Sequence, residues 1–144
     1  MYGTGHTGQV RYQRIESDGR ISFDSGWLKN LTVNGSRGVA VDIYMNDLDA
    51  ETSASIAIGT GNTTPSVSQT ALDAQVLTGA GTVEADADGI SLLISATLSG
   101  AWTGTFAEAG LFFGGTMVAR TLVSGSKVSA GQVISFTWKI TFTV

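Results

Sequence analysis

The sequence predicts an all-β protein, a single-domain β-sandwich of the jelly-roll-like kind. Three observations predict this fold: eleven residues of strict apolar and polar alternation at the C-terminal end, roughly ten shorter strand-like segments, and Gly-containing breaks between most of them. The length of 144 residues suits one domain. We expect the sandwich to cover residues 9–144 and a flexible Gly-rich arm to cover residues 1–8.

The clearest predicted strand covers residues 134–144. Its apolar residues all occupy one parity, and its Ser, Thr and Lys residues occupy the other between residues 135 and 143. Successive side chains of a strand point to opposite faces, so one face of this strand is apolar and the other is polar. The pattern is typical of a sheet that packs on a core with one side only.

The remaining elements follow from weaker patterns. A second alternating segment, residues 90–98, follows the turn sequence of residues 86–89 and forms a predicted hairpin with residues 82–87. One short helix is expected over residues 66–75, because Pro65 suits the first turn of a helix. Further strands are predicted over residues 10–15, 20–23, 27–33, 39–45, 53–58, 105–113 and 117–123.

Composition excludes several classes of function. The chain has no cysteine, which excludes disulfides, thiolate metal sites and cysteine nucleophiles. The first eight residues lack the basic and apolar regions of a secretory signal, and no segment approaches the roughly 18 apolar residues of a membrane span. We therefore expect a protein made in a cytoplasm, with no membrane partner.

Charge is scarce and unevenly distributed. Charged residues make up 14% of the chain where about 25% is usual, and a neutral, hydroxyl-rich surface suits contacts with neighbouring subunits. The net charge of −4 argues against a nucleic-acid partner. Residues 1–37 hold five basic and three acidic residues, a net charge of +2, and the remainder carries −6. The basic region either docks onto an acidic partner or, as we prefer, is scattered solvated charge.

The sequence offers no set of catalytic residues. The only histidine, His6, lies in the Gly-rich arm, whereas a Ser-His-Asp site needs a rigidly held imidazole. Asp47, Asp49 and Glu51 place oxygen ligands at alternate positions, as a calcium loop does, but lack the glycine and distal glutamate of an EF-hand. A polar loop is the preferred interpretation. We predict a non-enzyme without a metal site or cofactor.

The tryptophans differ in their expected positions. Trp138 lies on the apolar parity of the last strand and is expected in the core. Trp102 lies in a Gly-flanked segment and is the better candidate for an exposed contact with a neighbouring subunit or a sugar.

Glu108 is the single charge of an otherwise apolar and small stretch, residues 106–113. An unpaired buried carboxylate is costly, so Glu108 needs a partner such as Arg120 or backbone donors. A structural salt bridge is therefore predicted, and an active-site acid is the less favoured alternative.

Three segments together resemble small virion proteins of tailed bacteriophages. In such proteins a "GtG … sdtaL" segment precedes "EiGLf … lARt" and a closing strand similar to "itWritft". Similar stretches occur in phage tail-fibre and tail-collar proteins. The resemblance covers residues 53–144, which are 92 of the 144 residues. The matching segments here are residues 56–65 with 70–72, residues 108–112 with 117–120, and residues 136–142.

The resemblance implies a non-catalytic structural protein of the virion, made in the host cytoplasm. The first expectation is a capsid decoration or cement protein, a homo-oligomer with a trimer favoured, which binds the major capsid protein at the capsid surface. The alternative is a tail or tail-fibre component that contacts the host surface. The interface candidates are Tyr2, His6, Arg11, Arg14, Trp102, Thr137 and Thr141.

Overall fold

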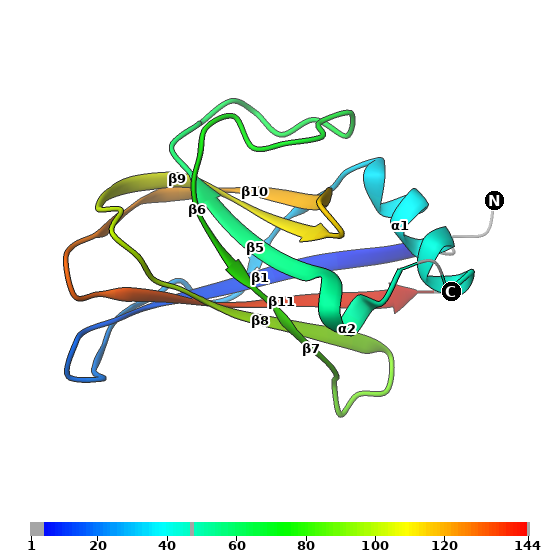
Figure 1. Ribbon diagram of the computed structural model, residues 1–144, viewed down its shortest axis with the longest axis horizontal. Coiled ribbons are helices and arrows are strands. Elements are labelled where there is room, and N and C mark those ends of the chain that lie inside the picture. Colours follow the sequence, from blue (N-terminus) through cyan, green and yellow to red (C-terminus); the bar gives the residue numbers. More distant parts are fainter. Residues whose placement is uncertain (1–4, 47, 144) are drawn as a thin grey trace.

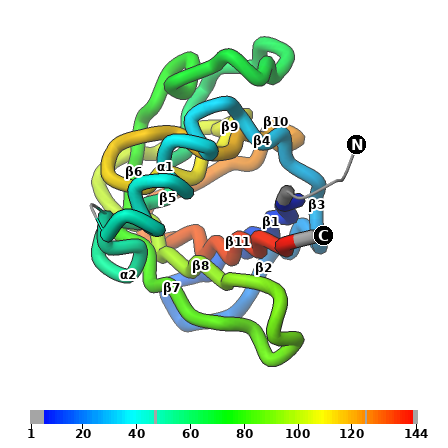
Figure 2. The backbone as a smooth tube through the Cα atoms, turned by 90° about the vertical axis from the view of Figure 1, so that its right-hand side faces the viewer, coloured from blue at the N-terminus to red at the C-terminus, as the bar shows by residue number. Residues whose placement is uncertain are grey.

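The computed structural model describes residues 5–46 and 48–143, which form two antiparallel sheets packed face to face (Figure 1). The first sheet contains β1 (Gly5–Ile15), β2 (Ile21–Asp24), β3 (Leu28–Lys29), β7 (Thr82–Ala85), β8 (Ser91–Leu98) and β11 (Val133–Thr143). Its strand order is β2-β1-β11-β8-β7, and β3 also pairs with β1. The first and last described strands therefore lie side by side, and the start of β1 and the end of β11 lie at the same end of the sandwich (Figure 2).

The second sheet lies above the first in Figure 1. It contains β4 (Leu31–Thr32), β5 (Ala54–Gly59), β6 (Gln75–Ala80), β9 (Gly104–Phe113) and β10 (Thr116–Val128), in the order β4-β10-β9-β5-β6. The predicted all-β sandwich is confirmed, while its jelly-roll-like connectivity stays a prediction. The strand predicted over residues 27–33 is split into β3 and β4, and β6 was not predicted.

The alternation predicted over residues 134–144 is confirmed in β11 from Ile134 to Ile140, while Phe142 is exposed and residue 144 lies outside the described residues. Ile134, Phe136 and Trp138 are fully buried in the core between the sheets, and Thr137 and Lys139 on the other parity are partly exposed. The strand is central in its sheet, with β1 on one side and β8 on the other. One-sided burial of a central strand gives the strongest period-two signal in the chain.

Two helices are present in the described residues, and neither was predicted. α1 (Gly35–Tyr44) replaces the strand predicted over residues 39–45. Val39 and Ile43 are four residues apart and share one helix face, which packs on the core, whereas Val41 points away and is exposed. Apolar residues at every second position fit both a strand and a helix with two apolar faces. The pattern therefore does not distinguish the two, and the predicted strand is wrong. None of the described helices is long and apolar enough to span a membrane.

The helix predicted over residues 66–75 is also wrong. The segment belongs to an irregular loop of residues 60–74, which connects β5 to β6. Several of its backbone groups bond to side chains of β9 and β10, as described below, and only isolated bonds such as Gln69 N–H to the Ser66 carbonyl join its own backbone. These tertiary hydrogen bonds compete with helix formation.

The predicted flexible arm over residues 1–8 requires a correction. Residues 5–8 belong to β1 and pair with β11 from Gly5 opposite Thr143 to Gly8 opposite Ile140. At Gly8 the pairing also needs glycine, because a Cβ there would lie 2.0 Å from Oδ1 of Asn30. Residues 1–4, with the candidate Tyr2, lie outside the described part of the chain.

Candidate functional site

A buried ion pair joins β9 to β10 in the second sheet. Nε of Arg120 donates to Oε1 of Glu108 at 3.0 Å, and both side chains are fully buried. The predicted structural salt bridge between these two residues is therefore confirmed. Two charges taken out of water are stable only when their remaining hydrogen-bonding groups also find partners.

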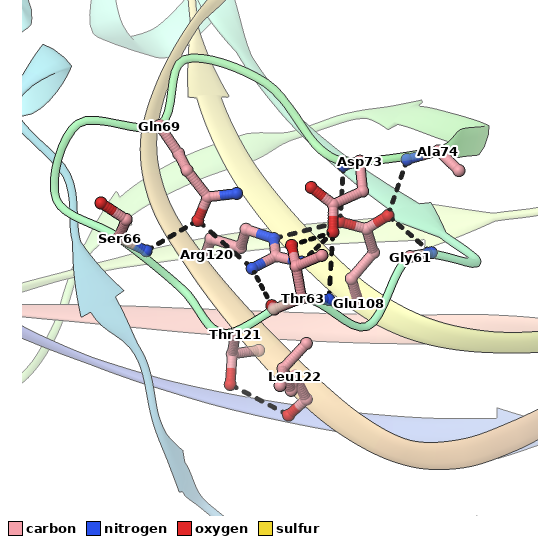
Figure 3. A network of polar contacts seen from close by, with 10 residues as sticks. All are labelled: Gly61, Thr63, Ser66, Gln69, Asp73, Ala74, Glu108, Arg120, Thr121 and Leu122. Atoms are coloured by element: carbon pink, nitrogen blue, oxygen red, sulfur yellow. Dashed lines mark hydrogen bonds and ion pairs between the residues drawn. The ribbon is translucent and has the colours of Figure 1, made fainter.

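Those partners come from the loop of residues 60–74 (Figure 3). Glu108 accepts three backbone N–H groups at 2.9 Å, from Gly61, Asp73 and Ala74. Arg120 donates to the carbonyl oxygen of Thr63 at 2.8 Å and to Oδ2 of Asp73 at 3.0 Å. We call this set of contacts the loop anchor. The loop anchor attaches the exposed loop of residues 60–74 to β9 and β10.

Two details show how closely the loop fits the ion pair. A Cβ at Gly61 would lie 2.6 Å from Oε2 of Glu108, so the close approach requires glycine. The carboxylate of Asp73 accepts a hydrogen bond from the Thr63 hydroxyl, which, with the nearby Arg120, lowers the Asp73 pKa below its ordinary value. The ionised carboxylate is thereby held beside the guanidinium.

The loop anchor unites residues from two of the phage-like segments. Gly61 and Thr63 come from the first segment, and Glu108 and Arg120 come from the second. The resemblance thus rests in part on a structural unit of the sandwich. In comparisons with known proteins, no family model, no curated protein and no solved structure matches the chain. The phage assignment therefore stays a proposal.

The predicted basic contacts, Arg11 and Arg14, are engaged within the chain. Nε of Arg11 donates to Oδ1 of Asp24 at 3.0 Å, and this pairing lowers the Asp24 pKa. Nη1 of Arg14 donates to the carbonyl oxygen of Lys127 at 3.1 Å, which ties β1 to the second sheet. The contact of Arg14 joins strands distant in the sequence, and the pairing of Arg11 depends on the register between β1 and β2; local patterns determine neither.

The other interface candidates are scattered over the sandwich. Thr137 is partly exposed on the outer face of the first sheet, and the Thr141 hydroxyl lies 2.9 Å from that of Ser91 in a hydrogen bond. Trp138 is buried as predicted. The expectation of an exposed Trp102 is wrong, because its ring is partly buried and packs against the core.

The acidic segment of residues 46–51 acts as a helix start. Oδ1 of Asp49 accepts the backbone N–H of Glu51 at 3.0 Å and caps α2 (Ala50–Ser53). Asp47 lies outside the described residues. Within residues 5–46 and 48–143, no group of three or more His, Asp or Glu side chains is arranged to hold a metal ion.

The structure contains an apolar cavity that was not predicted from the sequence. This cavity of about 330 Å³ lies beside α1, at the end of the sandwich where β1 begins and β11 ends. Its volume falls in the range of small-ligand pockets, roughly 300–1,000 Å³. Its apolar lining comes from α1 and from both sheets: Val39, Ile43, Phe113, Val118, Ile140 and Phe142.

The polar residues of this cavity are few. His6, Ser36 and Tyr44 contribute to the lining, and no Asp, Glu, Lys or Arg side chain of the described residues does. The imidazole of His6 lies beside Phe142, with 6.0 Å between ring centroids. Burial lowers the His6 pKa, because the charged ring would lose solvation there. Of the six interface candidates that lie in the described residues, His6 alone lines this cavity.

Five exposed apolar residues lie at this end of the sandwich, and two of them, Tyr44 and Phe142, line the cavity. Tyr44 is 92% exposed and Met45 is 67% exposed, although both are large. Three further exposed apolar residues lie on α1, at the start of β8 and on β11: Val41, Ile90 and Phe142. The backbone N–H of Phe142 donates to the carbonyl of Ile90, so these two are neighbours. We call these five residues and the cavity the α1-end surface.

The signal for this surface was present but ambiguous. Residues 39–45 are apolar at every second position, which a helix distributes over two faces. One face covers the core and the other has no partner in the described chain. A gathering of large apolar side chains at one end of a protein is typical of an interaction site.

Proposed function

We propose that this protein is a non-catalytic structural subunit of a tailed-phage virion, a capsid decoration protein that binds the major capsid protein as a homo-oligomer. The observation that carries the proposal is the α1-end surface, where large apolar side chains lie exposed at the same end of the sandwich as an apolar cavity. Large exposed apolar patches of this kind are typical of sites that interact with another protein. The phage context comes from the resemblance of residues 53–144.

Simple energetics support assembly through this surface. Fully burying one large apolar side chain contributes about 1.5–3 kcal/mol, while association costs about 4–15 kcal/mol in lost freedom. One residue is insufficient, whereas Val41, Tyr44 and Met45 together with Ile90 and Phe142 are of the right order. Repeated copies on a shell then add stability by mass action.

Capsid decoration is preferred to a role in the tail. The described residues form one short two-sheet block without a fibrous extension (Figure 1). Such a block suits a shell surface, where many compact copies bind between neighbouring subunits. A tail or tail-fibre component that contacts the host is the alternative, because the same segments resemble tail-fibre and tail-collar proteins.

Co-sedimentation with undecorated, expanded capsids tests the proposal. The wild-type protein is expected to pellet with the shells, and Tyr44→Asp, which places a charge on the α1-end surface, is expected to bind at least about 10-fold more weakly. Val67→Asp is the matched control, because Val67 is 50% exposed in the loop of residues 60–74. Binding to host cells but not to shells would contradict capsid decoration and favour the tail.

A further inference from the structure

We propose that the α1-end surface binds a second copy of this chain, and that it receives the exposed edge of the first sheet at the opposite end of that copy. The contact is head-to-tail, so each copy uses two different surfaces. This inference rests on the proposed function only in taking the α1-end surface as an assembly interface.

The second surface lies along the outer strands β2 and β3. Ile21 is 52% exposed, and Phe23 and Trp27 are also exposed although all three are large and apolar. β2 pairs with β1 on one side and ends its sheet on the other, and all four of its residues are exposed. We call Ile21, Phe23 and Trp27 the β2-edge surface.

The aromatic ring of Phe23 shows what this surface offers. It lies 5.6 Å from the Tyr12 ring, which is buried, and 5.8 Å from the guanidinium carbon of Arg14. Phe23 thus extends the inner face of the first sheet outward from the core. An edge strand with exposed apolar residues and an unpaired backbone edge is a site where another chain can add.

The two surfaces lie too far apart to meet within one copy. His6 near the start of β1 lines the cavity, and Ile15 at the end of β1 pairs with Ile21. Nine residue steps along a strand span roughly 30 Å. Figure 1 shows α1 at the right-hand end and the turn between β1 and β2 at the left-hand end. Within residues 5–46 and 48–143, neither surface can therefore cover the other.

Charge complementarity selects the second copy as the occupant. Around the α1-end surface, α1, α2 and β7 carry four acidic residues against one basic residue; these are Asp42, Asp49, Glu51 and Glu84 against Arg37. None of the four carboxylates forms an ion pair within the described residues. α2 and β7 contact each other, which brings Glu51 and the capping residue Asp49 near Glu84, while Asp42 lies on α1.

The β2-edge surface has the opposite sign. Five basic residues against three acidic ones lie on the segment from β1 to β3 and on the adjoining end of β10. Arg11 and Arg14 pair with Asp24 and Glu16, which leaves Arg20, Lys29 and Lys127 against Asp18. An apolar patch with a basic surround thus faces an apolar patch with an acidic surround when two copies stack. Complementary fields of this kind fix the orientation of a contact.

A contact between two different surfaces repeats from copy to copy. Such heterologous contacts close into a ring when the rotation between copies allows it and otherwise continue as a filament. A ring of three would match the trimer expected from the phage resemblance. The major capsid protein would then meet the faces of the ring that these contacts leave open.

Two variants test the inference by mass measurement in solution. Tyr44→Asp disables the α1-end surface, and Ile21→Asp disables the β2-edge surface; both positions are exposed, so the fold is expected to survive. The wild type is expected at a multiple of its 14.9 kDa mass, and each variant alone as a monomer. Val67→Asp is expected to keep the wild-type mass.

Mixing the two variants gives the decisive result. Each variant retains the surface that the other lacks, so an equimolar mixture is expected to form dimers and nothing larger. The two disabled surfaces both carry an added Asp, and their like charges prevent them from pairing with each other. Light scattering of the mixture at several concentrations measures this mass.

Three outcomes would overturn the inference. An Ile21→Asp protein of wild-type mass would show that the β2-edge surface is not the partner, and a mixture that stays monomeric would contradict the head-to-tail contact. A wild type that is monomeric at every concentration would also refute it. If that monomer still pellets with capsids through Tyr44, the proposed function stands while this inference fails.

Discussion

Glu108 and Arg120 occupy a place in the second sheet where a charge is expensive. Both side chains are fully buried, and each is held by the other and by groups of the loop of residues 60–74. Removing one partner would leave an uncompensated buried charge, which costs far more than the net contribution of the pair. The pair is therefore indispensable to this loop even if its net contribution to stability is small.

Glu108→Ala is predicted to lower the free energy of unfolding by about 3–5 kcal/mol, the usual cost of breaking a buried ion pair. The loop of residues 60–74 should also become sensitive to proteases, since three of its backbone N–H groups lose their acceptor. Urea denaturation and limited proteolysis measure the two effects. Glu84→Ala, at an exposed carboxylate, serves as the control. A Glu108→Ala protein as stable as this control would refute the anchoring role.

At the residue scale, the sequence allowed prediction of the ion pair but not of its surroundings. A lone carboxylate among apolar residues requires a partner, and Arg120 was within reach on the next predicted strand. The contacts to Gly61 and Asp73 join residues 47 and 35 positions apart from Glu108. Local patterns carry no information about such distant contacts.

The strands and helices differ in how far local pattern determines them. β11 was predictable because it is central, buried on one face and regular over its whole length. α1 was not, because Val39, Val41, Ile43 and Met45 satisfy both a strand and a helix with two apolar faces. The unpartnered outer face of α1 is both the reason for the error and the basis of the proposed interface.

A matched pair of substitutions tests the orientation of α1. Val39→Ala should lower the free energy of unfolding by about 1–3 kcal/mol, because it removes buried methyl groups. Val41→Ala should leave the stability of the isolated protein unchanged, because Val41 is exposed on the other face. Thermal or urea denaturation compares them. In a strand the two residues would share one face, so equal losses would contradict the helix.

The two ends of the sandwich differ in the sign of their excess charge. One end combines α1, an apolar cavity and unpaired carboxylates, and the other combines an exposed edge strand with an excess of basic residues. The charge asymmetry was visible in the sequence as +2 over residues 1–37 and −6 over the rest. Its placement at opposite ends was not, because it depends on β1 running the length of the sandwich.

The low content of charged residues is consistent with an apolar surface at one end of the protein. A surface that works by burial must avoid the desolvation of many charges, and 14% charged residues meets that need. The loop anchor keeps the charges of Glu108 and Arg120 inside, where they hold a loop to the sheet. The central claim is that the α1-end surface becomes covered when the protein assembles.

Hydrogen exchange measured on the protein diluted until it is monomeric and on the protein bound to capsids tests this claim most directly. Amides of α1 and of residues 45–46 are predicted to exchange at least about 10-fold more slowly in the bound state, because burial of Tyr44 and Met45 suppresses local opening of the helix. Amides of the loop of residues 60–74 should keep their rates. If the protein stays fully bound to the capsids and the exchange rates of α1 are unchanged, the α1-end surface is not covered in the assembly and the claim is wrong.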